Sequence, residues 1–135
     1  MASDPHISIR VNANETSVEF PTEGITISAA VESLGDQRYR FRSVPLFVES
    51  ASFMDIIEAD AAIDGKLTFQ QVVERSGWRV FDFILSREFI ASGKLEPVLA
   101  RADGYGAYWE RVFGGVLYIC VPPEVAWNPT AELAG

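Results

Sequence analysis

Residues that usually carry catalysis or bind metals are scarce in this sequence of 135 residues. His6 is the only histidine and stands in the polar N-terminal lead, so a serine or cysteine nucleophile would lack a base held in place by a third group. Cys120 is the only cysteine, and it lies in the apolar run 116–121, which is typical of a buried strand. The sequence therefore has too few histidines and cysteines for a zinc site, and it has no second cysteine for a disulfide. The sequence predicts no catalytic residues, no metal and no cofactor, and it favours a protein that is not an enzyme.

Carboxylates are plentiful, and Asp82 is the most informative of them. It interrupts the run 79–85, which is otherwise apolar on both faces beyond its first residue and so is typical of an inner strand. Because an unpaired charge in a buried strand is costly, we expect Asp82 to have an ionic or hydrogen-bonding partner. A structural role is favoured over catalysis, and Asp82 stays among the candidate binding residues.

Aromatic and arginine side chains, the types enriched in binding hot spots, gather in two short segments. The first contains Trp78 and Arg79, and the second contains Tyr105, Tyr108, Trp109 and Arg111. If the two segments meet in the fold, they form the best candidate binding surface of the chain. The alternative, that they are ordinary aromatic residues of the core and its rim, is favoured.

Three arginines alternate along one predicted strand and share a face opposite Tyr39. They are Arg38, Arg40 and Arg42. One interpretation pairs this stripe with carboxylates on a neighbouring strand, such as Glu58 and Asp60, which is an ordinary device of sheets. The other is an anion-binding stripe, and the first interpretation is favoured.

Charge and hydropathy narrow the class of partner. The formal net charge of −8 opposes binding to nucleic acid or to an anionic membrane surface, and it suits a basic protein partner. No apolar run approaches the ~20 residues that span a bilayer, and no secretory signal is visible, so we expect a soluble cytoplasmic protein. With 48% hydrophobic residues, the chain should form a single domain over residues 1–135, with loose termini at 1–5 and 128–135.

A hairpin at Asp64-Gly65 organises the predicted fold. Asp-Gly between two apolar-rich extended runs is a strong hairpin signal, because Gly accepts the positive φ of the turn. Residues 57, 59, 61 and 63 are expected to share one face. Val72-Val73 breaks the alternation of the returning strand, which predicts either a bulge or burial on both faces near that point. Similar alternation predicts strands at 7–11, 18–20, 25–31 and 39–41, with a second hairpin at Gly35-Asp36.

The C-terminal half is expected to alternate strand, helix and strand. Ser86 can cap a helix that runs to about Ala102, which Ser92-Gly93 and Pro97 could divide into two. A buried strand follows at 116–121. The predicted fold class is α+β: a curved, mostly antiparallel sheet or partial barrel of hairpins, with a C-terminal βαβ-like unit and one main helical segment.

Four short motifs carry a family resemblance. They are Val44-Pro45-Leu46-Phe47, Asp55-Ile56-Ile57, Leu67-Thr68-Phe69 and the run Val72 to Gly77. Their order and spacing resemble a bacterial family known as domain of unknown function 4265, over roughly residues 32–122. The resemblance implies a small bacterial cytoplasmic domain whose framework includes Pro45, Asp55, Ser76 and Gly77, and it implies no activity. The sequence departs from the family at Phe53-Met54, where a Gly is expected before Asp55, so a tight turn is not implied there.

Taken together, these features favour a non-enzymatic acidic binding domain that recognises a protein partner, such as an immunity or accessory protein. The alternative is a small-molecule-binding protein or small enzyme that uses Asp82, Tyr39, Arg40 or Trp78. This alternative requires a concave pocket of roughly 300 Å³ or more in the curved sheet. A third hypothesis is a homo-oligomer formed through an edge strand.

Overall fold

The computed structural model describes residues 14–133, and it divides the chain into two compact units. Their described parts are residues 14–77 and 78–133. Each unit has its own cluster of buried apolar side chains. The strand predicted at 7–11 and the loose N-terminus predicted at 1–5 lie outside the described residues. The single domain predicted over 1–135 stays a prediction.

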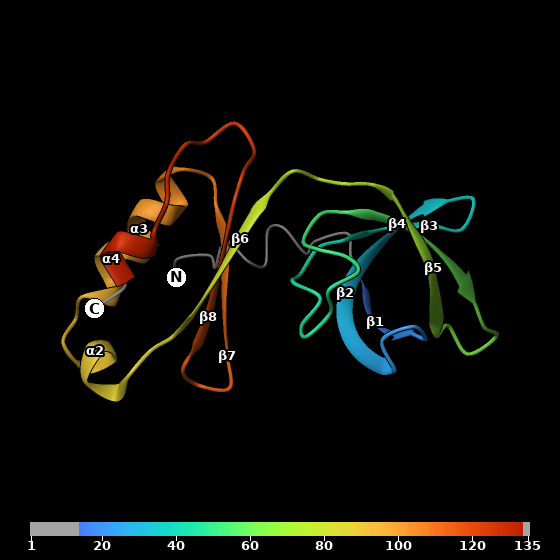
Figure 1. Cartoon of the computed structure of the whole chain (residues 1–135), viewed down its shortest axis with the longest axis horizontal. Helices are drawn as coiled ribbons and strands as arrows, with labels where there is room; N and C mark the ends of the chain where they lie inside the picture. The colour runs from blue at the N-terminus through green and yellow to red at the C-terminus, as the bar shows by residue number, and fades with distance from the viewer. Residues whose placement is uncertain (1–13, 134–135) are drawn as a thin grey trace. The chain divides into compact units, whose positions relative to one another are not determined.

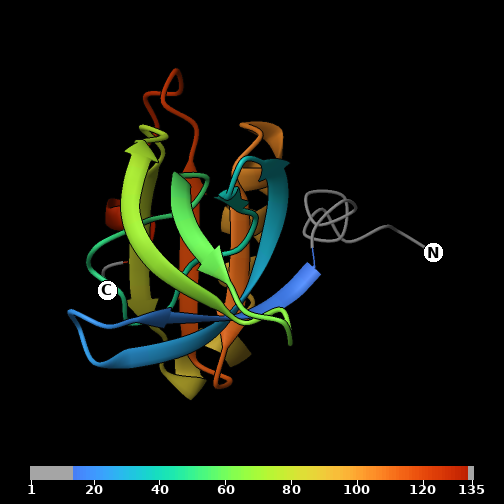
Figure 2. The ribbon, with the colours of Figure 1, turned by 90° about the vertical axis from the view of Figure 1, so that its right-hand side faces the viewer.

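The first unit is a closed barrel of five strands. The strands are β1 (Asn14–Phe20), β2 (Ile25–Gly35), β3 (Arg38–Phe41), β4 (Ile56–Ala61) and β5 (Leu67–Glu74). Each strand pairs antiparallel with the next, which leaves the first and the fifth pointing the same way. The barrel therefore closes through a short parallel pairing of β1 with β5, in which Val18 lies opposite Leu67 (Figure 2). The predicted partial barrel of hairpins is confirmed.

Inward-pointing residues of alternate strand positions fill the barrel. Phe20 stands at the centre of this core, with its ring 4.8 Å from that of Phe69 and 6.4 Å from that of Phe41. The other buried members of the cluster are Val18, Ala29, Val31, Ala51, Ile57, Ala59 and Leu67. The interior at this level is a packed core of side chains.

The predicted hairpin at Asp64-Gly65 joins β4 to β5. The amide of Ala62 donates to the carbonyl of Lys66 at 2.8 Å, and that of Gly65 to the carbonyl of Ala62 at 2.9 Å. Gly65 has φ +90°, where a side chain would be strained. Ile63 does not share the inward face of β4 as expected. It is 109% exposed, because the turn ends the alternation at Ala61.

Two bulges bend β5. The register passes from Ile56 opposite Glu74 to Ile57 opposite Val72, so Val73 is an extra residue. The bulge predicted at Val72-Val73 is thus confirmed, and a second one places Gln70 outside the register. Bulges increase local twist, which helps a small sheet to close.

The second unit packs three helices against a three-stranded sheet. Its elements are β6 (Arg79–Ile84), α2 (Arg87–Ala91), α3 (Leu95–Gly104), β7 (Tyr108–Val112), β8 (Val116–Val121) and α4 (Thr130–Leu133). The helices lie on one face of the sheet (Figure 1). The order is β6-β8-β7, and both pairings are antiparallel. Helices separate β6 from β8 along the chain, as the predicted βαβ-like unit requires. However, β6 is an edge strand and not the inner strand that its apolar run suggested, since β8 is the inner strand.

The predicted helical segment is divided into two helices, α2 and α3, which is the alternative that Ser92-Gly93 and Pro97 allowed. Ser86 caps α2 by accepting the amide of Phe89 at 3.0 Å, and Gly93, with φ +79°, ends it before α3 begins. At the other end of the unit, Leu133 is buried and Pro129 is fully buried. Two residues of the terminus that was predicted to be loose from 128 are therefore buried, while Thr130 and Ala131 between them are exposed.

Candidate functional site

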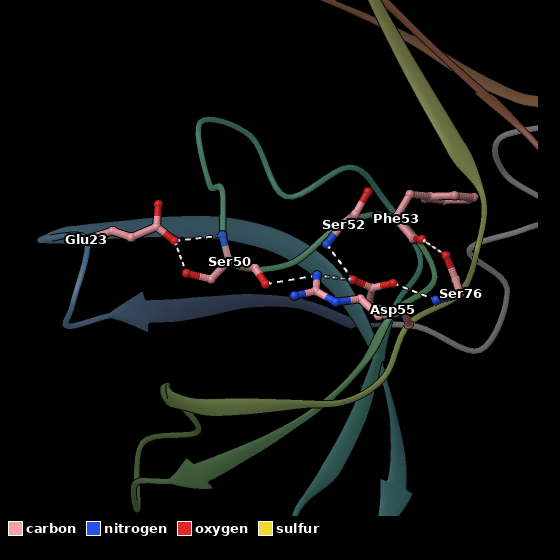
Figure 3. A network of polar contacts seen from close by, with 7 residues as sticks. Glu23, Ser50, Ser52, Phe53, Asp55 and Ser76 are labelled. Carbon is pink, nitrogen blue, oxygen red and sulfur yellow. Dashed lines mark hydrogen bonds and ion pairs between the residues drawn. The ribbon is translucent and has the colours of Figure 1, made fainter.

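One end of the barrel is closed by the long loop 42–55, and Asp55 fixes this loop to the end of β5. The Asp55 side chain is 1% exposed, and it accepts the amide of Ser52 at 2.9 Å and that of Ser76 at 2.7 Å (Figure 3). Ser76 in turn donates its hydroxyl to the carbonyl of Phe53 at 2.7 Å. A buried carboxylate that accepts two amides is well satisfied, so this arrangement is a structural clamp.

A second carboxylate holds the tip of the same loop. Glu23, in the turn between β1 and β2, accepts the amides of Glu49 at 3.0 Å and Ser50 at 2.9 Å, and the hydroxyl of Ser50 (Figure 3). The bond from the Ser50 hydroxyl, followed by the amide of Glu49, lowers the pKa of Glu23 below its usual value. The Arg75 guanidinium bridges the two carboxylate sites, since it donates to the Ser50 carbonyl at 3.2 Å and lies 3.4 Å from Asp55.

The other framework residues have identifiable places in this closed end. Pro45 is buried within the loop, and Gly77 has φ +77°, a conformation that favours Gly. A tight turn does form before Asp55, whose amide donates to the carbonyl of Ser52 at 3.1 Å. Met54 occupies the place expected for Gly and adopts φ +68°. The turn therefore forms with a non-glycine residue in the left-handed conformation, which is energetically unfavourable.

As far as residues 14–133 show, the opposite end of the barrel is open, and it contains two adjoining hollows. The mouth pocket, of about 240 Å³, is lined by Thr16, Val31, Ser33, Tyr39, Ala61, Gly65 and Leu67. The rim hollow, of about 370 Å³, is lined by Glu15, Thr16, Ser17, Asp64, Gly65 and Lys66. Thr16 and Gly65 line both. The mouth pocket and the rim hollow together are the candidate site.

The mouth pocket exists because the inward rows of the strands end in small side chains. Towards this end, Phe20 and Val18 of β1 are followed by Thr16, and Val31 of β2 is followed by Ser33. On β4 the inward row ends in Ala61. Sequence reasoning missed these residues. Their small size at the end of each inward row can be read along the chain, but their meeting around one pocket cannot.

The barrel unit carries most of the negative charge of the chain, and part of it lies at the rim hollow. Residues 14–77 contain eleven carboxylates and five basic side chains, a net charge of −6, whereas 78–133 contain seven and five, a net charge of −2. In the rim hollow, Asp64 accepts the amide of Lys66 at 3.0 Å and Glu15 accepts the hydroxyl of Ser28 at 3.2 Å. The Lys66 ammonium lies 4.0 Å from Glu19. The hollow therefore has two carboxylates and one ammonium that is shared with a third carboxylate.

Two exposed apolar side chains border this end, one in the β4–β5 turn and one near the end of β2. Ile63 is fully exposed in the β4–β5 turn, and Leu34 is 40% exposed at the end of β2. Large exposed apolar side chains beside a pocket and a charged rim are the usual composition of a protein-recognition surface.

The arginine stripe forms ion pairs on the outside of the barrel. Arg40 and Arg42 both reach Glu32 on β2, at 3.5 and 3.0 Å. The expected cross-strand ion pairs are therefore present, but the carboxylate partner of these two arginines is Glu32 and not Glu58 or Asp60. Arg38 lies opposite Glu58 in the register of β3 and β4. Tyr39, the aromatic residue between them, points inward and lines the mouth pocket.

The two hot-spot segments are connected through Trp127, which sequence reasoning did not include. The Arg79 guanidinium donates to the carbonyls of Val125 and Trp127, and it lies 5.6 Å over the ring of Phe81. Tyr105 stacks on Trp127 with ring centroids 5.1 Å apart. Arg79 and Tyr105 therefore belong to one cluster that holds the C-terminal segment in place.

The remaining hot-spot residues do not form one surface. Tyr108 is buried and donates its hydroxyl to Glu110 at 2.9 Å, while Trp109, on the other face of β7, donates its indole N–H to Asp103 at 2.9 Å. Arg111 donates to the carbonyl of Gly114 at 2.8 Å, and Trp78 is half-buried. Their role in binding stays a prediction, and the described contacts are those of core and rim residues.

Asp82 is exposed, so the expectation of a buried carboxylate that needs a partner is wrong. It stands on edge strand β6 opposite Tyr118. Burial, and then the negative charges of Asp82 and Glu110, raise the pKa of Tyr118. Burial also raises the pKa of the Cys120 thiol well above its usual value, which fits the small core residue that was predicted.

Among residues 14–133, no group of three or more histidine, cysteine, aspartate or glutamate side chains could hold a metal ion. Within the same residues, no helix has the length and apolar character that crossing a bilayer requires.

Sequence comparison identifies the family. The model of the family described as Domain of unknown function (DUF4265) matches residues 28–133. The chain belongs to this family. The DUF4265 match extends beyond the four motifs to the end of the second unit, and the family description carries no activity. No curated protein shows significant similarity to the chain.

A solved structure shares the DUF4265 chain's fold. It is described as the novel crystal structure of a hypothetical protein from Neisseria gonorrhoeae, with a TM-score of 0.59 and 14% identity. The match covers 88% of this chain and 82% of the other. At this identity the likeness concerns the fold alone.

Proposed function

We propose that this DUF4265 protein is a non-enzymatic binding domain that recognises a basic protein partner through the open end of its barrel. The proposal places it in a bacterial cytoplasm, as an accessory or immunity-type protein. The observation that carries the proposal is the mouth pocket, which opens beside an acidic rim hollow and the exposed apolar side chains of Ile63 and Leu34.

Charge supports a basic partner. Of the net charge of −8, six units belong to residues 14–77, where the open end lies. A surface of one sign accelerates encounter with the opposite sign and repels like-charged surfaces, so the interaction should weaken steeply with salt.

Size supports a protein partner. Pockets for small ligands usually measure about 300–1,000 Å³ and bury most of the ligand. The mouth pocket, at about 240 Å³, is smaller than this range and suits one large side chain. Interfaces are commonly anchored by such a side chain in a pocket, surrounded by a polar rim.

The test is affinity capture from the native host with the immobilised full chain. Ala61→Phe fills the mouth pocket, and Ala62→Phe, at the next exposed position, is the matched control because Ala62 does not line the pocket. We expect a basic protein to be retained by the wild type and by Ala62→Phe, lost with Ala61→Phe, and released between about 50 and about 500 mM salt. Retention by all three proteins alike, or no retained protein at low salt, would overturn the proposal.

The rim hollow favours a second candidate function, the binding of a small polar molecule. At about 370 Å³ it reaches the size of a small-ligand site, and carboxylates, hydroxyls and an ammonium converge on it. Thermal-shift screening of polar metabolites tests this candidate. A stabilising compound whose effect is lost in Asp64→Asn but not in Asp60→Asn supports it, and a screen without such a compound rejects it.

A further inference from the structure

The mouth pocket and the rim hollow share two of their lining residues, and this limits what can fill both. Thr16 and Gly65 form part of each wall. At Gly65 no atom lies within 4 Å of the place that a Cβ would take. A chemical group bound in the mouth pocket and another bound in the rim hollow would therefore be neighbours, with Thr16 and Gly65 between them.

The mouth pocket selects an apolar group. Its inner wall consists of Val31, Leu67 and the ring of Tyr39, and Ala61 borders it. The hydroxyl residues Thr16 and Ser33 complete the lining. A volume of about 240 Å³ accommodates a leucine, methionine or phenylalanine side chain.

The rim hollow selects a cation. Glu15 and Asp64 place two carboxylates in its wall, and Lys66, the only basic residue among its lining residues within 14–133, has its ammonium 4.0 Å from Glu19. A guanidinium or ammonium in the hollow would gain charge-assisted hydrogen bonds, whereas a carboxylate or phosphate would be repelled.

Resting on the proposed function, we infer that the open end reads a short linear segment of the partner, in which a large apolar side chain is followed or preceded within one or two residues by arginine or lysine. The apolar side chain enters the mouth pocket, and the cation enters the rim hollow. The exposed Ile63, at the tip of the turn that carries Asp64, covers the segment from outside.

The test is selection of random peptides displayed on phage against the immobilised full chain, followed by fluorescence anisotropy with the enriched peptides. We expect enriched sequences to contain the apolar–basic pair. Ala61→Phe should weaken binding at least about tenfold, because a blocked anchor costs more than about 1.4 kcal/mol, while Ala62→Phe should leave it unchanged. Circular dichroism confirms that both variants are folded.

The cation has its own pair of variants. Asp64→Asn keeps an oxygen that can accept the Lys66 amide but removes the charge from the rim hollow, so we expect about three- to tenfold weaker binding and a smaller salt dependence. Asp60→Asn removes a carboxylate from the outer face of β4 that lines neither hollow, and it should change affinity less than about twofold.

Three results would overturn the inference: no enriched peptide, enriched peptides without the pair, or equal binding by Ala61→Phe and Ala62→Phe. The proposed function fails separately. If host capture still yields a basic protein that Ala61→Phe loses, while no peptide is enriched, the barrel end recognises a folded surface and not a linear segment. If capture and selection both yield nothing, both proposals are wrong.

Discussion

Replacing Asp55 with asparagine should destabilise the barrel more than any other single removal of charge in residues 14–77. Its two carboxylate oxygens each accept one backbone amide, from Ser76 at 2.7 Å and from Ser52 at 2.9 Å. Asparagine has one carbonyl oxygen, so its NH₂ group would face one of these two N–H donors. The variant Asp55→Asn therefore leaves one partly buried amide without an acceptor and places two donors together.

The magnitude follows from the number of bonds lost. A hydrogen bond to a charged group contributes about 1.5–3 kcal/mol, and an unsatisfied buried donor costs a similar amount. The contact with Arg75 adds at most about 1 kcal/mol, because the Arg75 side chain is 66% exposed and its charge is screened by solvent. We expect the free energy of unfolding to fall by about 2–4 kcal/mol, a large share of the about 5–15 kcal/mol typical of a domain.

The assay is urea unfolding followed by circular dichroism and by tryptophan fluorescence. Residues 14–77 contain no tryptophan, so the fluorescence of Trp78, Trp109 and Trp127 reports on the second unit and circular dichroism reports on both. Coincident transitions would support the single domain that the sequence predicts. Asp60→Asn, which replaces an exposed carboxylate that accepts from Gln70 at 2.9 Å, is the control and should cost less than about 0.5 kcal/mol. If Asp55→Asn costs no more than this control, the clamp described here is not what holds the loop.

Three further predictions concern the same chain. Met54→Ile should lower the free energy of unfolding in urea by at least about 2 kcal/mol, because a β-branched residue is strained at φ +68°. An apolar exchange of similar volume at an unstrained position usually costs less. Met54→Gly should be better tolerated than Met54→Ile, and the reverse order would contradict the strain. The bonds from Ser50 and Glu49 lower the pKa of Glu23, so the stability that they contribute is present above about pH 4.5 and is lost as the pH falls through the pKa of the folded state. Glu23→Gln should therefore lose less stability than the wild type on acidification. Parallel pH profiles of the two proteins would refute this. Arg79→Met removes the guanidinium nitrogen Nη2 that donates to the carbonyls of Val125 and Trp127, so it should lower the Tm and shift the tryptophan emission, whereas an unchanged spectrum would show that these two bonds do not hold the C-terminal segment.

Local chemistry predicted most of the barrel. Asp64-Gly65 specified its hairpin because a left-handed turn residue has few alternatives, and the broken alternation at Val72-Val73 specified its bulge. Ser86 and Gly93 likewise set the limits of α2 through a cap and a positive φ. These features depend on neighbours within a few residues, so they can be read along the chain.

Burial of single residues was less predictable where it depends on distant strands. An apolar run such as 79–85 has the same composition at the edge of a sheet as inside it, and only the order β6-β8-β7 places Asp82 in solvent. The turn that exposes Ile63 begins one residue earlier than alternation alone suggested.

By itself the sequence determined most of the strands, the turn at Asp64-Gly65 and the acidic charge, because each follows from residue types and short spacings. It left open whether the segment 86–103 forms one helix or two. The tertiary structure alone decided that Thr16, Ser33 and Ala61, from three different strands, end together around one pocket beside Asp64. The physical reason is closure of the barrel: which strand ends meet is fixed by the β1–β5 pairing, a contact between residues about fifty positions apart that no local pattern encodes.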